Sequence, residues 1–329
     1  MRTRTLGRSD LQVPVICFGC WAIAGDSIWG EQDERDAINA MHEAIDHGLN
    51  FFDSAEGYGA GGSEALLGRG LSDRRDRVIL ATKASPNHHA PDALKQACED
   101  SLQRMQTDYL DLYQLHWPSR EVPFADTWGA MQELIDEGKV RAAGVSNFGP
   151  QDLGTLLEAG RPASDQVAYS LLFRAVEYEI APTCEAEGIS ILCYSPIMQG
   201  MLAGKFAKPD DVPDSRARSR HFSDERPQAR HGEDGAEELT FETIAAIREI
   251  AEDLGEPMHR VALAWLIAQP AVGSVIVGIR SPEQARDNIA AGNLELPSEV
   301  IDRLNEATRP LKERLGANAD MWQGESRIR

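Results

Sequence analysis

Four polar residues in the first third of the chain carry the functional groups of a proton-transfer site: Asp53, Tyr58, Lys83 and His116. Asp53, Lys83 and His116 each follow a short apolar run of the kind that forms a buried strand. Polar residues at the downstream ends of parallel strands face the active-site rim of a (β/α)8 barrel. Tyr58 lies five residues after Asp53 in a glycine-flanked loop, from which its phenol can reach the same rim. The four groups are therefore predicted to converge.

Such a group of side chains suits a reaction in which a carbonyl accepts hydride, because the carbonyl oxygen then needs a proton donor in an electropositive site. Tyr58 is the expected donor. A free phenol titrates near about 10, and the ammonium of Lys83 is expected to lower that pKa. Asp53 is expected to keep Lys83 protonated and oriented, and His116 to orient the carbonyl oxygen or share the proton relay. A structural ion pair, a loop aromatic and a core histidine are the alternatives for each residue taken singly.

The elements that position these residues alternate along the chain. After an N-terminal β-hairpin expected over residues 3–14, eight strand-like runs alternate with segments of helical periodicity. Near-continuous apolar strands joined by helices are typical of a parallel sheet, and eight such units predict an α/β fold, the (β/α)8 TIM barrel. No linker divides the chain, so one barrel domain is expected over residues 1–329. The strands are expected at residues 15–19, 50–53, 78–82, 110–115, 142–145, 165–168, 189–194 and 274–277.

Two segments depart from this repeat. Residues 205–238 form a long polar stretch after the seventh strand. Long loops inside compact domains are often functional, so this loop is a candidate lid. It carries Arg216, Arg218, Arg220 and His221. These side chains could fold over bound phosphates or pair with neighbouring carboxylates at the surface. The weakly patterned tail after Leu315 carries Met321 and Trp322, which could fold back onto the body.

Composition and charge limit the class of protein. With 329 residues, of which 42% are hydrophobic and 26% charged, the chain is predicted to be a soluble globular protein. Its formal net charge of -20 would repel nucleic acid and anionic membranes, so neither is an expected partner. No apolar run reaches the roughly 18 residues of a membrane span, and residues 1–7 lack the apolar stretch of a signal peptide. A cytoplasmic location is expected, and the oligomeric state stays open.

The cysteines are expected to be reduced side chains that pack in the protein, and not redox or metal-binding groups. There are five of them: Cys17, Cys20, Cys98, Cys184 and Cys193. An odd number argues against a complete disulfide framework. The CxxC spacing of Cys17 and Cys20 lies in and just after a strand-like run, whereas a redox CxxC opens a helix. No second CxxC completes a zinc site.

Two further patterns have competing explanations. The segment Gly57–Gly62 matches the GxGxxG of a Rossmann fold, but that motif needs its first glycine directly after the strand, and residues 53–56 intervene here. A Rossmann domain is therefore not expected. Asp53, Glu56 and His116 could be metal ligands. A lysine beside them would oppose a cation, so no metal site is expected.

Motifs along nearly the entire chain resemble the aldo-keto reductase superfamily, and most closely its bacterial branch typified by general stress and inositol-related reductases. The first motifs, which hold the four polar residues, are Asn50–Gly59, Ala81–Lys83 and Leu115–Pro118. The later ones are Gly144–Phe148, Gln166 with Tyr169, Tyr194–Pro196, Gly200–Lys205 and Gly278–Gln284. The resemblance implies an oxidoreductase in which Tyr58 is the general acid.

The resemblance also implies where a nicotinamide cofactor is held. Tyr194 would stack on the nicotinamide, and the residues from Ser195 to Lys205 would carry the pyrophosphate. An arginine at position 280, just before a helix, suits the 2′-phosphate of NADP, so NADPH is expected in preference to NADH. The full expected set is Ser146, Asn147, Gln166, Tyr194, Ser195, Pro196, Gly200, Leu202, Gly204, Lys205, Gly278, Arg280, Gln284, Asp287 and Asn288.

The implied substrate is a small carbonyl compound or sugar. Trp21, Trp29 and Trp117 are expected to line its pocket. The leading hypothesis is an NADPH-dependent reductase of aldehydes, ketones or sugars, reversible as an alcohol or sugar dehydrogenase. The alternative is a nicotinamide-binding regulatory or scaffolding subunit with little turnover, as the potassium-channel β subunits are in this superfamily. A metal-dependent hydrolase on the same fold would instead lose activity with a chelator.

Overall fold

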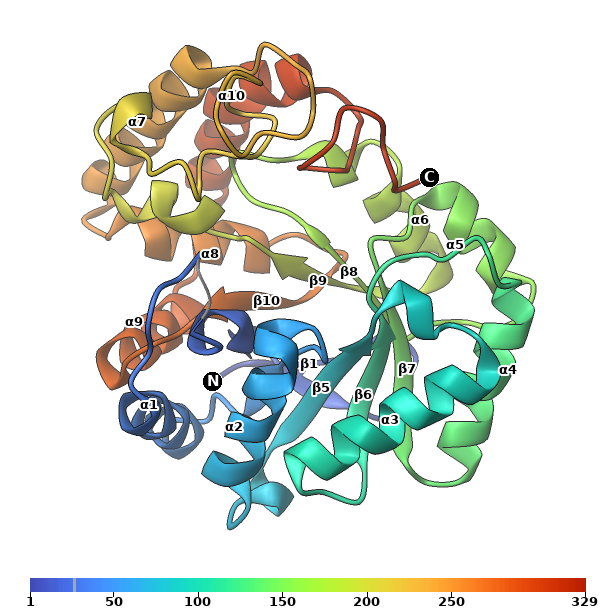
Figure 1. The fold of residues 1–329 in the computed structure, drawn as a ribbon. Helices are drawn as coiled ribbons and strands as arrows, with labels where there is room; N and C mark the ends of the chain where they lie inside the picture. The colour runs from blue at the N-terminus through green and yellow to red at the C-terminus, as the bar shows by residue number, and fades with distance from the viewer. Residues whose placement is uncertain (26–27) are drawn as a thin grey trace.

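Eight parallel strands close into a barrel at the centre of the molecule (Figure 1). The computed structural model describes residues 1–25 and 28–329. The strands neighbour one another in the order β10-β3-β4-β5-β6-β7-β8-β9, so the last strand closes on the first. The predicted (β/α)8 TIM barrel is confirmed. The strands are β3 Ile16–Gly19, β4 Phe51–Asp53, β5 Ile79–Ala84, β6 Leu110–Leu115, β7 Val140–Ser146, β8 Ser164–Ala168, β9 Ser190–Tyr194 and β10 Val272–Gly278.

Strand residues are buried on both faces, because side chains fill the barrel and helices cover its outside. Every residue of β3, β4, β6 and β8 is buried. β7 begins two residues before the expected position 142, because Val140 pairs with Leu110 of β6. The barrel closes where Val275 of β10 pairs with Ile16 of β3.

Ten α-helices of the described chain surround the barrel (Figure 1). Side chains cap helix starts at Asp33, which accepts from Asp36 N at the start of α1, and at Ser281, which accepts from Gln284 N at the start of α9. None of the described helices has the length and apolar character needed to cross a membrane. They are α1 Glu34–Asp46, α2 Gly62–Leu71, α3 Pro91–Met105, α4 Phe124–Asp136, α5 Pro150–Leu157, α6 Ile180–Glu187, α7 Glu237–Leu254, α8 Met258–Ile267, α9 Pro282–Asn293 and α10 Ser298–Leu315.

The N-terminal hairpin packs against the barrel interior. β1 Thr3–Thr5 pairs antiparallel with β2 Gln12–Pro14, as predicted. Leu6, Leu11 and Val13 form one apolar cluster with strand residues that include Phe51 at the start of β4. This cluster fills the amino-terminal end of the barrel, so a ligand site is left to the carboxyl ends of the strands.

The long loop and the C-terminal tail pack against each other on the rim. Arg220 donates from Nη1 to the carbonyl of Asn318 and from Nη2 to that of Leu315, both at 2.9 Å. The tail then ends beside α5, where Arg329 O accepts from Asp152 N at 3.0 Å (Figure 1). Helix α10, which precedes the tail, was not predicted from the sequence pattern. The helix contains Pro310, a residue type that normally breaks or kinks a helix, so the sequence pattern did not indicate a helix of this length.

Candidate functional site

The four polar residues predicted to converge lie together at the carboxyl ends of neighbouring strands. Asp53 is the last residue of β4, Lys83 lies near the end of β5, and His116 directly follows β6. Lys83 Nζ donates to Asp53 Oδ2 at 2.6 Å and to the carbonyl of Ser54 at 2.7 Å. It also donates to the Tyr58 hydroxyl at 3.4 Å. Lys83 is fully buried, so its charge is compensated from within the protein.

The glycine-rich segment that matched GxGxxG serves to present Tyr58. It forms a short 3-10 turn, Tyr58–Gly61, in which Gly59 and Ala60 have φ of 58° and 52°. The Tyr58 ring lies against two aromatic neighbours. Trp21 stacks on it at a centroid distance of 5.8 Å, and His116 meets it edge-on at 5.7 Å. The phenol is therefore held in a fixed position next to Lys83 and the imidazole.

The protonation states follow from burial and from Lys83. Burial, the largest effect, raises the pKa of Tyr58 above that of an ordinary phenol, and the Lys83 ammonium offsets only part of this rise. The Lys83 ammonium lowers the pKa of Tyr58 as expected, but sequence reasoning did not account for the desolvation of the phenol, which outweighs it. Burial also opposes the charge on Lys83, but Asp53 and Tyr58 together raise the pKa of Lys83. Burial and Lys83 lower the pKa of His116 to about 3.

Two amides hold the remaining oxygen of Asp53. Gln114 Nε2 and Gln166 Nε2 donate to Asp53 Oδ1 at 3.0 and 2.9 Å. Gln166 also donates to Gln114 Oε1 at 3.3 Å, so its carbonyl oxygen is the atom left to meet a ligand. Gln114 was missed by the sequence analysis. Its position two residues before His116 on a strand placed it on the same face and could have revealed it.

The ends of β7, β8 and β9 are joined by side-chain hydrogen bonds beside this cluster. Ser146 Oγ donates to the carbonyl of Gln166 at 2.8 Å, and Asn147 Nδ2 donates to the carbonyl of His116 at 3.1 Å. Tyr194 Oη donates to Asn147 Oδ1 at 2.9 Å. These bonds place amide and phenol groups at fixed positions on the rim.

A pocket of about 670 Å³ opens over the cluster. It brings together most of the residues expected to bind cofactor or substrate. Lys83 is buried and donates to two residues of the lining, Asp53 and Tyr58. Leu202 and Gly204 are not among the described residues that line the pocket. The expected residues that line it are Trp21, Trp29, Asp53, Tyr58, His116, Trp117, Ser146, Asn147, Gln166, Tyr194, Ser195, Pro196, Gly200, Lys205, Gly278, Arg280, Gln284, Asp287 and Asn288.

Arg280 is held by the loop that follows the first barrel strand. Its Nε donates to Gln32 Oε1 at 2.6 Å, and its Nη1 and Nη2 donate to the carbonyls of Trp29 and Glu31 at 2.7 and 2.5 Å. A guanidinium has further N–H donors beyond these three, so the held side chain can still bind an anion. Nearby, Asp287 is paired with Arg260, so its carboxylate is already neutralised.

The long loop of residues 205–238 and the tail after Leu315 both supply residues that line the pocket. The sequence analysis left the role of the loop arginines open and did not place the tail at the pocket. Arg216 and Arg218 line the pocket, whereas Arg220 and His221 are buried in contacts with the protein body. The tail contributes Trp322, Gln323 and Arg327. The sequence signal for the tail was limited to the apolar pair at positions 321 and 322. Its approach to the pocket depends on contacts between distant segments.

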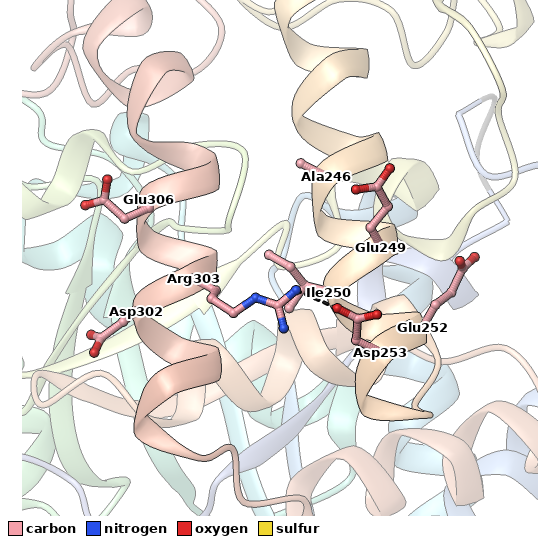
Figure 2. A pocket seen from close by; sticks show the side chains of 8 residues that line it. All are labelled: Ala246, Glu249, Ile250, Glu252, Asp253, Asp302, Arg303 and Glu306. Atoms are coloured by element: carbon pink, nitrogen blue, oxygen red, sulfur yellow. Dashed lines mark hydrogen bonds and ion pairs between the residues drawn. The ribbon is translucent and has the colours of Figure 1, made fainter.

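A second hollow, of about 650 Å³, lies between α7 and α10 and carries mostly carboxylates (Figure 2). Arg303 there donates to Asp253 Oδ2 at 2.6 Å. None of the four central polar residues lines this hollow. No group of three or more His, Cys, Asp or Glu side chains suited to a metal ion occurs in the described parts of the chain.

Comparisons with known proteins agree with this geometry. The model of the aldo/keto reductase family matches residues 15–309. The chain is 30% identical to the NADH-specific methylglyoxal reductase of Escherichia coli K12, covering 95% of this chain and 100% of that protein. A solved aldo/keto reductase from Klebsiella pneumoniae, in complex with NADP and acetate, is 30% identical with a TM-score of 0.73, over 92% and 94% of the two chains. The glycerol dehydrogenase of Gluconobacter oxydans gives 27% identity and a TM-score of 0.81, over 94% and 95%.

Proposed function

The chain belongs to the aldo/keto reductase family, and from that premise we propose that it reduces aldehydes, ketones or sugars with NADPH, Tyr58 being the general acid. The observation that carries this proposal is the contact between the Tyr58 hydroxyl and the buried ammonium of Lys83 at 3.4 Å. The same residues catalyse the reverse oxidation of an alcohol or sugar, with the phenolate as base.

The residues present fit a nicotinamide dinucleotide. A pocket of about 670 Å³ suits a ligand of this class. Gln199 Oε1 is buried and lacks a hydrogen-bond partner among the described residues, so a donor on a ligand would satisfy it. Tyr194 offers an aromatic face for the nicotinamide, and Asn147 and Gln166 would meet its carboxamide. The chemistry supplied by a bound nicotinamide is hydride transfer to the carbonyl carbon.

The proton for the carbonyl oxygen comes from Tyr58 in this proposal. His116 is neutral near neutral pH because its pKa is lowered to about 3, so its imidazole orients the carbonyl oxygen without adding positive charge. As negative charge develops, Tyr58 donates its proton and becomes a phenolate. Lys83 stabilises that phenolate, and Asp53 holds the ammonium in place at 2.6 Å. Two amides on Asp53 prevent it from rotating away.

Arg280 supports NADPH over NADH as the cofactor. Its guanidinium is fixed by three hydrogen bonds and keeps N–H donors for a 2′-phosphate. Lys205 and Arg216 line the same pocket and suit the pyrophosphate. Because the E. coli relative is described as NADH-specific, the two cofactors should be compared directly.

The test is cofactor oxidation with a panel of aldehydes, ketones and sugars, for the wild type and the Tyr58→Phe variant. We expect turnover to fall by about 100-fold or more in the variant while NADPH still binds, because the acid is lost and the ring is kept. Tyr178→Phe is the matched control, since Tyr178 is exposed on the surface. Unchanged turnover in Tyr58→Phe would refute the proposed acid. Tight cofactor binding without turnover in the wild type would favour a regulatory subunit.

A further inference from the structure

The pocket concentrates positive charge in an acidic protein. Six of its described lining residues are lysine or arginine, while the chain has a net charge of -20. Asp53 and Asp287 are the carboxylates of the described lining, and they are paired with Lys83 and Arg260. The cations are Lys205, Arg216, Arg218, Arg230, Arg280 and Arg327. The pocket therefore favours ligands with several negative charges.

Three of these cations lie on the side proposed for the cofactor phosphates. Arg280 is held by the loop of residues 29–32. Arg216 donates to the carbonyl of Gln199 at 3.5 Å, within the segment that precedes Lys205. The charges of the cofactor phosphates thus account for this group of cations.

Arg218 also lines the pocket and lies near an indole that stacks on the proton donor. Its guanidinium carbon is 5.7 Å from the ring of Trp21, the indole that stacks on Tyr58. It is also 4.7 Å from the ring of Trp322 in the tail. The guanidinium therefore lies near two indoles, one of which also stacks on Tyr58.

Arg327 approaches the same region from the tail. Its guanidinium carbon is 3.9 Å from the ring of Trp117, the residue that follows His116. Two bonds to the fully buried Asp320, from Nε at 2.7 Å and Nη2 at 3.0 Å, fix its orientation. Its Nη1 donates to no group in the described part of the chain, and this nitrogen can meet a ligand oxygen.

We propose that Arg218 and Arg327 form an oxyanion subsite for the substrate, so that this protein prefers carbonyl compounds that carry a carboxylate or phosphate at the end remote from the carbonyl. This inference rests on the proposed reductase function. The carbonyl lies at Tyr58 and His116, indole rings cover the middle of the substrate, and the two planar guanidinium groups meet the oxyanion. Neither arginine touches the reacting atoms, so both act on substrate selection.

The experiment compares three aldehydes of one shape: 4-carboxybenzaldehyde, its neutral isostere 4-formylbenzamide, and 4-formylphenyl phosphate. We expect kcat/KM for an anionic aldehyde to exceed that for the amide by about 10-fold or more in the wild type, which corresponds to about 1.4 kcal/mol. Arg327→Gln and Arg218→Gln should each bring this ratio towards one. Arg303→Gln removes the same charge at the remote hollow of Figure 2 and should keep the ratio. The better anionic substrate identifies the oxyanion as carboxylate or phosphate.

The outcomes separate this inference from the function on which it rests. Turnover of the amide at or above the rate of both anionic aldehydes would overturn the subsite and leave the reductase function intact. An anion preference that survives in both arginine variants would also overturn it. Absence of turnover with every carbonyl tested would overturn the proposed function and the subsite together. Because Arg327→Gln leaves the buried Asp320 without its ion-pair partner, thermal unfolding is measured for each variant, and Arg218→Gln tests the subsite independently.

Discussion

The Lys83 ammonium and the Asp53 carboxylate are 2.6 Å apart on neighbouring strands, and both side chains are almost completely buried. A buried ion pair contributes little net stability, because desolvation offsets most of the attraction. The position of this ion pair explains why the protein keeps it, since Lys83 also donates to the Tyr58 hydroxyl. Asp53 keeps a positive charge under the phenol at the point where negative charge would develop.

The pH dependence of reduction should be set by Tyr58 and not by His116. Because the pKa of His116 is lowered to about 3 and that of Tyr58 is raised above its ordinary value, neither group changes charge between about pH 5 and pH 9. We expect kcat/KM for reduction to be flat over this range and to fall at higher pH as the phenol ionises. A pH titration under steady-state conditions measures this, and an inflection near about 6.5 would contradict the neutral imidazole.

Asp165 should make the protein less stable as the pH rises. Burial raises the pKa of Asp165 to about 8, and its Oδ2 has no hydrogen-bond partner among the described residues. The unfolded-state value is about 3.9. The folded state therefore binds the extra proton between these values, so the free energy of unfolding decreases from about pH 4 to about pH 8.

The Asp165→Asn variant tests this dependence. It should flatten the decrease and be more stable than the wild type above about pH 8, because no buried charge forms. Asp302→Asn, at an exposed position, should follow the wild-type curve. Denaturant unfolding across the pH range gives the result. Parallel curves for the wild type and Asp165→Asn would show that Asp165 is not the group responsible.

Arg280 should decide the cofactor preference. Replacing it with methionine removes the donors proposed for the 2′-phosphate, so the Kd for NADPH should rise by about 10-fold or more relative to that for NADH. Arg286→Met in α9, the helix that begins just after Arg280, is the control, because Arg286 pairs with Glu43 at 3.0 Å on the outside of the barrel. Titration of each cofactor by fluorescence measures both constants. Equal weakening of NADPH and NADH would indicate that Arg280 only holds the loop of residues 29–32.

Gly149 should control the placement of the tail that lines the pocket. A Cβ at this position would lie 2.3 Å from Arg329 O and 2.5 Å from Arg329 C, which are backbone atoms that cannot move alone. Gly149→Ala should therefore displace the tail, increase its hydrogen exchange and raise KM for the carbonyl substrate. Gly154→Ala lies within α5, the helix that Gly149 precedes, and has no heavy atom within 4 Å of the added Cβ. It should leave KM unchanged and stabilise α5 by about 0.5–1 kcal/mol.

Much of the barrel and its central cluster could be predicted because the signals are local. Each strand is a short apolar run, and a polar residue at its end must lie on the rim once the strands are parallel. For this reason Asp53, Lys83 and His116 could be placed together before the structure was known. Gln114 is the penultimate residue of β6, as Lys83 is of β5, so the same rule could have placed it on the rim.

The sequence by itself determined the order of the strands and of most helices, the polar residues at the strand ends and the family to which they point, since these depend on residue type and spacing. Only the tertiary structure decided the direction of the Tyr58 pKa shift, because desolvation depends on every segment that covers the phenol. It also decided that Arg327 meets Trp117, residues more than two hundred positions apart. No local pattern specifies such a contact. It follows from where the barrel, α10 and the tail bring the chain together.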